Sequence, residues 1–294
     1  MATETNRAAA ATSTKAWRRL QASFPGMIST LILTLGAILM FAPFLWMIST
    51  AFQPGQNAFS LPPKWIPLEF TLDNFTRVLS SDVPFLRFIF NSFVVAGTVT
   101  IGQLITCSMA GFAFAKLRFY GSNVIFVLLL AGLMVPIQVT IIPVYIIMRQ
   151  FGLIDTLWAL ILPFVTNVFG VFLLRQFFTS MPDDLINAAR IDGASIWRTF
   201  YQIALPLARP MLVALAIITF TNTWNNFFLP LIFINSWENM TLPLGLQSLS
   251  NVYGGGNVGA IMAGVSLGVI PVLIIFLLAQ RQIIEGMMAG SVKG

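Results

Sequence analysis

The side chains of this 294-residue sequence that could recognise a ligand are amides and one indole inside otherwise apolar segments. The candidates for lining a path through the protein are Gln138, Asn167, Asn222, Trp224 and Asn225, with Asn91, Thr140 and Asn226 as further polar candidates. Amides donate and accept hydrogen bonds, as sugar hydroxyls do, and an indole ring offers a stacking surface. The alternative is that each amide only bonds a neighbouring helix, a contact worth about 0.6 kcal/mol in membranes.

The sequence gives little support for covalent catalysis or for a metal site. The sequence has no His and one Cys, Cys107, so neither a nucleophile–base pair nor a cluster of metal ligands is visible. No Gly-x-x-x-x-Gly-Lys-Ser/Thr motif occurs, which argues against a P-loop for ATP in this chain. The long apolar segments contain no carboxylate, whereas ion-coupled transporters usually place one there. We expect no catalytic residue, no metal site and no cofactor in this chain.

The elements that position the amides are long apolar segments. Hydrophobic residues make up 57% of the sequence and charged residues 9%, against about 25% charged in a typical soluble domain. A helix needs roughly 20 apolar residues to cross the hydrocarbon core, where backbone groups have to be bonded within the segment. The sequence predicts an all-α membrane protein with six transmembrane helices, near residues 27–50, 86–110, 122–148, 156–177, 209–233 and 257–281.

The net charge of +6 could suggest a nucleic-acid partner, but its distribution favours a membrane orientation instead. With six spans and a cytoplasmic N-terminus, 12 of the 16 Lys and Arg residues fall inside. The four outside are Lys64, Arg77, Arg87 and Arg149. Cytoplasmic loops of membrane proteins carry such an excess of positive charge. We expect both termini in the cytoplasm, lipid around the protein, and no nucleic acid.

This orientation divides the chain into three parts. A cytoplasmic tail is predicted at 1–26, a six-helix membrane domain at 27–289, and a second cytoplasmic tail at 290–294. The membrane domain contains an outer loop at 53–84 and a cytoplasmic loop at 178–209.

The cytoplasmic loop is patterned as two short helices. Ser180 and Asp183 fit a capping box, which predicts a first helix ending near Ile191. Gly193 then breaks the helix, as glycine does at helix ends. Asp192 or Ser195 is suited to cap a second helix, from Ile196 toward Leu205.

The predicted helices offer a surface to a partner protein. Leu185, Ala188 and Ala189 form an apolar face on the first helix. Trp197, Phe200 and Tyr201 are bulky residues of the kind that dominate interface energetics. The alternative is a loop that packs only under its own helix bundle.

The loop resembles the EAA loop of bacterial ABC-importer permeases, whose pattern is Glu-Ala-Ala, three residues, Gly, nine residues and Ile-x-Leu-Pro. The residues on that pattern are Ala188, Ala189, Asp192, Gly193, Ala194, Ile203, Leu205 and Pro206. Asn187 stands where the family usually has Glu.

The likeness covers nearly the whole chain after residue 27, and it is greatest to the carbohydrate branch, in particular the shorter permease of the maltose and glycerol-phosphate type systems. The matching stretches are Asn91-Ser92, Met134–Pro143, Trp224-Asn225, Leu229–Leu231, Thr241–Gly245 and Gly290–Gly294. Each stretch is short, but all occur in order around the loop motif.

The resemblance implies a type I ABC-importer permease fold in the bacterial cytoplasmic (inner) membrane. It implies a heterodimer with a second permease subunit, two ATPase subunits that bind ATP and Mg²⁺, and an extracytoplasmic solute-binding protein. The ATPase-coupling loop would comprise Asn187, Ala188, Ala189, Asp192, Gly193, Ala194 and Pro206, with Lys293 as a further contact. The implied solute is a sugar or oligosaccharide; the alternatives are a polyol or glycerol-phosphate compound and, from another class, ion-coupled secondary transport.

Overall fold

The computed structural model describes residues 29–54, 65–67, 69–80, 83–253 and 257–291. Within these ranges every regular element is helical, in agreement with the predicted fold class. The predicted tail 1–26, Lys293 and part of the predicted outer loop 53–84 lie outside the described residues. The last helix, α14 (Val258–Ser291), runs on into the segment predicted as the C-terminal tail.

Four helical segments are long and apolar enough to cross a membrane. They are Ser29–Ala51, α3 (Phe85–Lys116), Leu157–Ser180, and the Val258–Leu277 part of α14. Two bent pairs pass the same test: α4 (Ser122–Gly132) with α5 (Ile137–Gln150), and Ile196–Leu207 with α11 (Arg209–Trp224). The described part of the chain thus holds up to six spans, the predicted number, if each bent pair is one span.

The third predicted span, 122–148, is not one straight helix. α4 and α5 are bent by 101° relative to each other across the break between them. Pro136 is extended (φ −68°, ψ 142°) directly before α5, because proline has no N–H for a helical bond and its ring clashes with the preceding turn. Pro143 instead lies inside α5. The predicted span is therefore a broken one, and the bend falls at the first of its two prolines.

The fourth and fifth predicted spans, 156–177 and 209–233, are also interrupted. The fourth consists of α6 (Leu157–Ile161), η2 (Leu162–Phe164) and α7 (Val168–Ser180). The fifth consists of α11 and, after residues 225–227, α12 (Phe228–Phe233). Irregular backbone at membrane depth is tolerated only where protein or water satisfies its polar groups.

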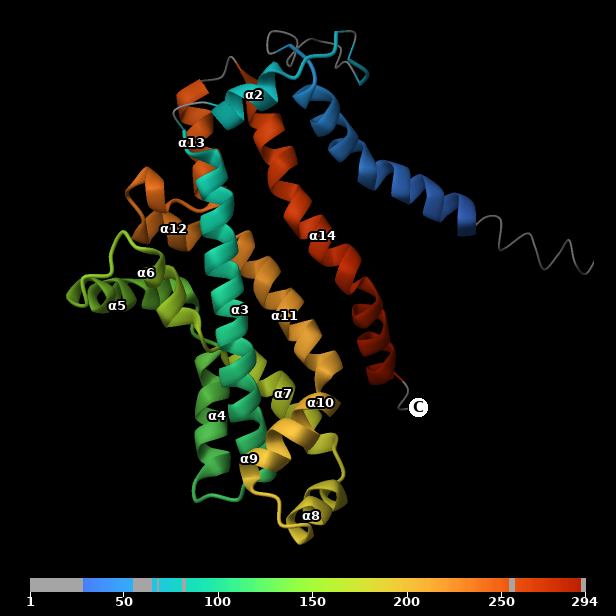
Figure 1. Cartoon of the computed structure of the whole chain (residues 1–294), viewed down its shortest axis with the longest axis vertical. Helices are drawn as coiled ribbons and strands as arrows, with labels where there is room; N and C mark the ends of the chain where they lie inside the picture. Colours follow the sequence, from blue (N-terminus) through green and yellow to red (C-terminus); the bar gives the residue numbers. More distant parts are fainter. Residues whose placement is uncertain (1–28, 55–64, 68, 81–82, 254–256, 292–294) are drawn as a thin grey trace, which may run out of the picture.

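α3 is the central helix of the bundle (Figure 1). It packs most extensively on α7 and next on α11, while α14 packs on α11, α13 (Leu242–Tyr253) and α2 (Asp73–Ser80). The backbones of α3 and α7 approach closely at Gly111, where an added Cβ would lie 2.8 Å from the backbone nitrogen of Arg175. Small residues permit such backbone-to-backbone packing of membrane helices.

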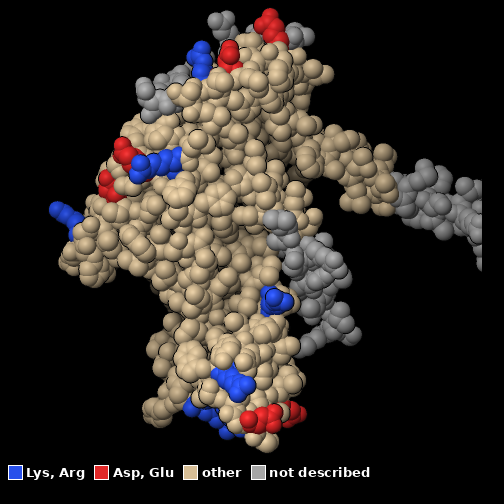
Figure 2. Space-filling model, viewed as in Figure 1, with Lys and Arg blue, Asp and Glu red and all other residues tan. Residues whose placement is uncertain are grey.

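The two ends of the bundle carry different connecting segments. At the lower end in Figure 1 lie the cytoplasmic-loop elements α8 (Asp183–Ile191), α9 (Ile196–Thr199), η3 (Phe200–Ala204) and α10 (Leu205–Leu207). α2 and α13 lie at the upper end. On the face shown in Figure 2, Lys, Arg, Asp and Glu gather at the upper end, on the projection at the left and toward the lower end, and wide areas between these groups are uncharged. This distribution suits a protein that crosses a membrane.

The helix Ser29–Ala51 stands apart from the other helices over most of its length (Figure 1). None of its most apolar 18-residue window is buried, and Leu33, Leu39 and Met40 are each more than 70% exposed. Only its last turn joins the core, where Ala51 is fully buried beside Val78 and Phe85. The apolar sides of this helix are therefore free to meet lipid or another subunit.

Candidate functional site

The loop at 178–209, predicted to be cytoplasmic, turns between its two helices at Gly193. This residue has a φ of +76°, in the left-handed region that glycine adopts without a steric penalty. The backbone N–H of Ala194 reaches back to the carbonyl of Ala189 at 2.9 Å, the bond pattern of a helix that ends on a left-handed residue. The predicted break at Gly193 is confirmed.

The caps of these helices differ in part from the prediction. Ser195 caps α9, because its Oγ accepts from the backbone N–H of Arg198 at 3.2 Å. The capping box of Ser180 and Asp183 is wrong: Ser180 ends α7, and its hydroxyl donates to the carbonyl of Phe177 at 2.8 Å. Pro182 occupies the N-cap position of α8 instead, without a side-chain bond.

The inner side of the loop packs on its own bundle. Ile186, Ala189 and Phe200 are buried in a cluster that includes Phe112 of α3 and Phe178 of α7. The sequence predicted Ala189 on a free apolar face; this is wrong, because the helix turns Ala189 into this buried cluster.

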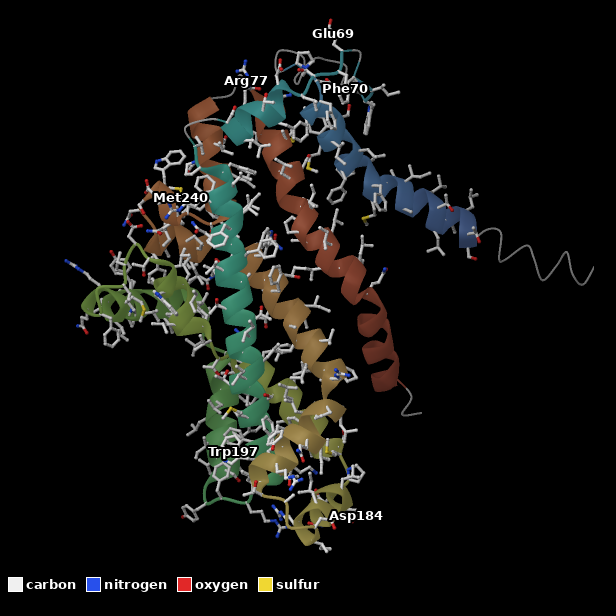
Figure 3. The ribbon with its side chains drawn as sticks, in the orientation of Figure 1. Glu69, Phe70, Arg77, Asp184, Trp197 and Met240 are labelled. Atoms are coloured by element: carbon white, nitrogen blue, oxygen red, sulfur yellow. The ribbon has the colours of Figure 1, made fainter. Side chains whose placement is uncertain are left out.

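The outer side of the loop presents apolar groups to solvent. Leu185, Ala188 and Ile191 follow one another at three-residue spacing on α8, and Ile191 is 86% exposed. Trp197 and Tyr201 are 62% and 54% exposed. Figure 3 shows Trp197 and Asp184 at the lower end of the molecule, on the elements that carry this surface. The sequence left two alternatives open for this loop: packing against its own bundle, or a surface for a partner. The structure has both, on opposite sides of the loop.

The remaining residues of the predicted coupling loop lie at the same end. Asn187 lines a polar hollow between α8 and the α3–α4 connection, together with Arg118 and Arg190. Asp192 follows α8 directly, and Pro206 lies within α10.

One ion pair fixes the loop to the central helix. Lys116, the last residue of α3, donates to the Asp183 carboxylate and, at 2.7 Å, to the carbonyl of Met181. The Lys116 side chain is 5% exposed and that of Asp183 78%. The hydrogen bond and positive charge of Lys116 lower the pKa of Asp183. Movement of the start of α8 is therefore tied to the C-terminal end of α3.

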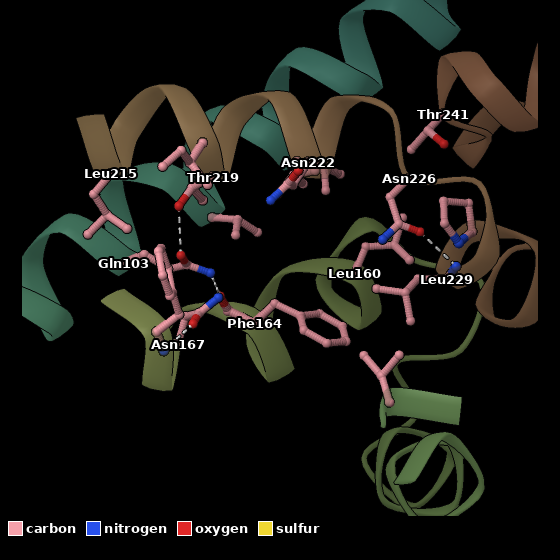
Figure 4. Close-up of a pocket in the computed structure, with 17 residues that line it drawn as sticks. Gln103, Leu160, Phe164, Asn167, Leu215, Thr219, Asn222, Asn226, Leu229 and Thr241 are labelled. Carbon is pink, nitrogen blue, oxygen red and sulfur yellow. Dashed lines mark hydrogen bonds between the residues drawn. The ribbon is translucent and has the colours of Figure 1, made fainter. Parts of the chain in front are cut away.

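A half-open cavity of about 440 Å³ lies between α3, the interrupted fourth span and α11 (Figure 4). Pockets of about 300–1,000 Å³ commonly hold small ligands. It is lined by Val95, Val99, Gln103, Ile137, Leu160, Phe164, Asn167, Phe169, Leu215, Ile218, Thr219, Asn222, Thr223, Asn226, Leu229, Pro230 and Thr241. Among the described residues, no group of three or more His, Cys, Asp or Glu side chains is placed to bind a metal.

The predicted path residues divide between this cavity and other places. Asn167 and Asn222 line the cavity, and so does the further candidate Asn226. Trp224 does not: it is 2% exposed and packs against Phe93 and Phe220.

Two other predicted path residues, Gln138 and Asn225, are exposed and do not line the cavity. The Asn225 amide donates to the carbonyl of Thr221 at 2.9 Å. The further candidate Asn91 bonds the carbonyls of Glu238 and Met240, at 2.8 and 2.9 Å, and Thr140 bonds the carbonyl of Ile137. Asn91 thus bonds a neighbouring segment, as the alternative predicted, whereas Asn225 and Thr140 bond carbonyls of their own helices.

Several cavity residues were not identified from the sequence. Gln103 and Thr219 are polar residues inside predicted spans, so an inventory of all amides and hydroxyls there would have found them. Phe164 gave no signal, because one aromatic residue in an apolar run resembles any other core residue.

The interrupted fourth span forms the floor of the cavity, and side chains of α3 donate hydrogen bonds to carbonyl groups of that span. The side chains of Gln103, Thr106 and Cys107 donate to the carbonyls of Phe164, Val165 and Asn167, at 2.9, 2.7 and 3.3 Å. The Gln103 oxygen in turn accepts from the Thr219 hydroxyl of α11 at 2.8 Å. Gln103, which is 5% exposed, therefore joins three spans beside the cavity.

A second node of hydrogen bonds joins the loops at the opposite end from α8. Asp155, a non-glycine residue with φ +60°, accepts from the backbone N–H groups of Asn235 and Ser236, both at 2.9 Å, and from the Ser236 hydroxyl. Its carbonyl accepts from the Asn239 amide at 2.7 Å. Desolvation raises the pKa of Asp155, but the hydrogen bonds from Ser236, Asn235 and Asn239 together outweigh it, so the pKa lies below its ordinary value.

Comparison with known proteins agrees with this architecture. The family model for binding-protein-dependent transport system inner membrane components matches residues 107–287. The arabinooligosaccharides transport system permease protein AraQ of Bacillus subtilis is 36% identical, over 78% of this chain and 81% of that protein. The diacetylchitobiose uptake system permease protein NgcG of Streptomyces coelicolor is 32% identical, over 90% and 87%.

The fold is likewise found in a solved structure. A chain from the crystal structure of a bacterial ABC transporter involved in the import of the acidic polysaccharide alginate superposes with a TM-score of 0.77, at 21% identity. The match covers 87% of this chain and 95% of the other. The bundle with its interrupted spans is therefore the fold of an ABC-importer permease.

Proposed function

The chain belongs to the binding-protein-dependent transport system inner membrane component family, and we propose that it forms half of the translocation path of an ATP-driven sugar importer. A separate ATPase supplies the energy, and an extracytoplasmic binding protein delivers the solute. The observation that carries the proposal is the cytoplasmic loop, with its left-handed turn at Gly193 and its exposed apolar outer side. This surface is suited to a cleft on an ATPase subunit, and Lys116 links its movement to α3.

A second permease subunit accounts for the isolated helix Ser29–Ala51. Side chains on all sides of this helix are exposed, and only its last turn is held by its own bundle. Van der Waals packing is a main source of membrane-helix association. A neighbouring subunit can therefore pack against the part of this helix that its own bundle does not cover. The proposed assembly is a heterodimer of permeases with two ATPase subunits.

The solute proposed for this importer is a sugar or oligosaccharide. Support comes from the relatives, whose names specify arabinooligosaccharides and diacetylchitobiose. A polyol or glycerol-phosphate compound is the alternative solute.

Reconstitution tests the proposed function. We expect proteoliposomes that contain both permeases and the ATPase to accumulate solute only with ATP and the binding protein, and to continue when ionophores collapse the proton gradient. Uptake into vesicles that contain this chain alone, driven by an imposed ion gradient, would contradict the proposal. Vesicles with an ATPase that cannot hydrolyse ATP are the control.

The proposed orientation places both termini and the α8–α10 loop in the cytoplasm. Gln150, the last residue of α5, and Ser195, the N-cap of α9, are both exposed, and the proposed orientation puts them on opposite sides of the membrane. In a Cys107→Ser background, a membrane-impermeant thiol reagent outside intact cells should label Gln150→Cys and not Ser195→Cys. Permeabilised cells should show labelling at both positions. Labelling of both in intact cells would rule out this topology.

A further inference from the structure

The cavity between α3 and α11 has two chemically different walls. One wall is a row of polar side chains on α11 and its C-terminal end, with Thr219, Asn222 and Asn226. The facing wall is mostly apolar, with Leu160, the ring of Phe164 and Leu229. The amides of Gln103 and Asn167 also line it, but both are engaged in hydrogen bonds within the protein. Figure 4 shows the amide nitrogens of Asn222 and Asn226 directed away from α11 into the cavity, with the Phe164 ring at the opposite edge.

The two amides on the polar wall differ in how they are already engaged. The Asn226 oxygen accepts from the backbone N–H of Leu229 at 2.9 Å, so its NH₂ group is the part left for a ligand. Asn222, on α11, is exposed to the cavity, and Asn226 follows in the break between α11 and α12. Both side chains line the same cavity. Their two amide groups can therefore donate to neighbouring hydroxyls on one ligand.

A hydroxyl at the rim of the cavity also needs a partner. Thr241 lines the cavity and is 3% exposed, yet its Oγ1 has no hydrogen-bond partner among the described residues. A buried hydroxyl without a partner costs free energy, and such groups in native structures call for an explanation. Rotation about its Cα–Cβ bond would let this hydroxyl meet a ligand group in the cavity.

The cavity offers nothing that favours an anion. None of the described residues that line it is ionisable. The N-terminus of α7 lies at its edge, and helix N-termini attract anions. Here, however, the Asn167 side-chain oxygen already accepts from the N–H groups of Phe169 and Gly170, at 2.7 and 3.4 Å. The feature that would hold a phosphate or carboxylate is thus occupied by the protein itself.

From these observations we propose that this cavity is a subsite for one ring of a neutral sugar. The Phe164 ring receives the apolar C–H face of the sugar, and Asn222, Asn226 and Thr241 bond its hydroxyls. Phosphorylated and uronic solutes are disfavoured, because they would lose hydration without gaining a positive charge. The subsite rests on the proposed function, and it adds that this subunit contacts the solute and selects for neutrality.

Substitutions that keep shape and change chemistry test the subsite in the reconstituted full importer. Asn226→Asp keeps the oxygen that caps α12 and removes the NH₂ donors; Asn222→Asp makes the same change four residues away. Each should lower uptake of a labelled neutral arabino-oligosaccharide about 10-fold, the effect of losing one well-placed hydrogen bond of about 1.4 kcal/mol. Phe164→Leu should lower it similarly, while Phe164→Tyr should stay within about twofold.

ATP hydrolysis stimulated by the binding protein serves as the control measurement. Hydrolysis should persist in these variants, because the substitutions lie outside the loop proposed to contact the ATPase. A parallel loss of hydrolysis would indicate misfolding. Parental hydrolysis in Phe164→Tyr and Phe164→Leu, with defective uptake only in Phe164→Leu, would exclude that explanation. Unchanged neutral-sugar uptake in all three disruptive variants overturns the subsite.

The charge of the transported solute gives an independent outcome. If the cognate binding protein delivers a galacturonate oligosaccharide or glycerol phosphate, and uptake depends on ATP, the importer function stands and the neutral subsite is wrong. If no solute is taken up with ATP and binding protein, the proposed function itself fails. Uptake of the neutral oligosaccharide, with at least 10-fold preference over its uronate counterpart, supports the subsite.

Discussion

Replacing Gly193 with Val is expected to separate ATP hydrolysis from uptake while the membrane helices remain assembled. Gly193 has φ +76°, where a residue with a Cβ loses roughly 1–2 kcal/mol and a β-branched residue fits worst. An added Cβ would meet no atom of this chain within 4 Å, so the effect is one of backbone conformation and not of crowding. The turn should open, which changes the angle between α8 and α9.

The measurement is transport alongside ATP hydrolysis in the reconstituted complex. Uptake should fall by about 10-fold or more, since about 1.4 kcal/mol already corresponds to tenfold in an equilibrium. Gly193→Asn is the matched control, because asparagine tolerates the left-handed conformation better than valine does. Asn187→Glu, which introduces the residue usual in the family, should be tolerated. Complexes with Gly193→Val that assemble, hydrolyse and transport like the parent would show that the loop does not couple the two processes.

Replacing Gly111 with Leu is expected to prevent correct assembly of the bundle. An added Cβ would lie 2.8 Å from the backbone nitrogen of Arg175 and 2.9 Å from the Cβ of Leu174, both on α7. Relief requires the two most extensively packed helices to move apart. Overpacking of a well-packed core typically costs about 1–3 kcal/mol, and the backbone contact places this site at the upper end.

The yield of monodisperse protein in detergent and its thermal unfolding midpoint measure this effect. Gly97→Leu is the control on the same helix, because a Cβ at Gly97 would meet nothing within 4 Å. We expect Gly97→Leu to resemble the parent and Gly111→Leu to be lost or strongly destabilised. Equal behaviour of the two variants would mean that α3 and α7 do not pack as described.

The positions of the spans were predictable because length and apolarity alone determine them. The positions at which the spans break were not predictable in this way. Pro136 and Pro143 are equivalent in the sequence, yet only Pro136 lies at a bend. The break before α7 follows Pro163 of η2, and it is stabilised by Gln103 and Thr106, about sixty residues away in sequence. Such breaks depend on partners that only the folded structure brings together.

The site was predictable to different degrees in its two parts. The turn at Gly193 and the cap at Ser195 follow from local chemistry, and the sequence indicated both. The cavity depends on which side of α11 faces α3. Asn222 and Trp224 are two residues apart on that helix, and only Asn222 lines the cavity. The hydrophobic residues of α11 do not reveal which side of the helix faces α3, because residues that face lipid and residues that face the core are equally hydrophobic.

Asp155 makes the link between two outer loops resistant to acid. Its lowered pKa means that its hydrogen bonds to Ser236 and Asn235 contribute stability above its unfolded pKa and are lost only as pH falls through the still lower folded value. In the proposed orientation this node faces the external medium, which the cell does not buffer. The two loops should therefore stay joined at pH values where a carboxyl of ordinary pKa already gains its proton, so that the surface offered to the binding protein keeps its shape.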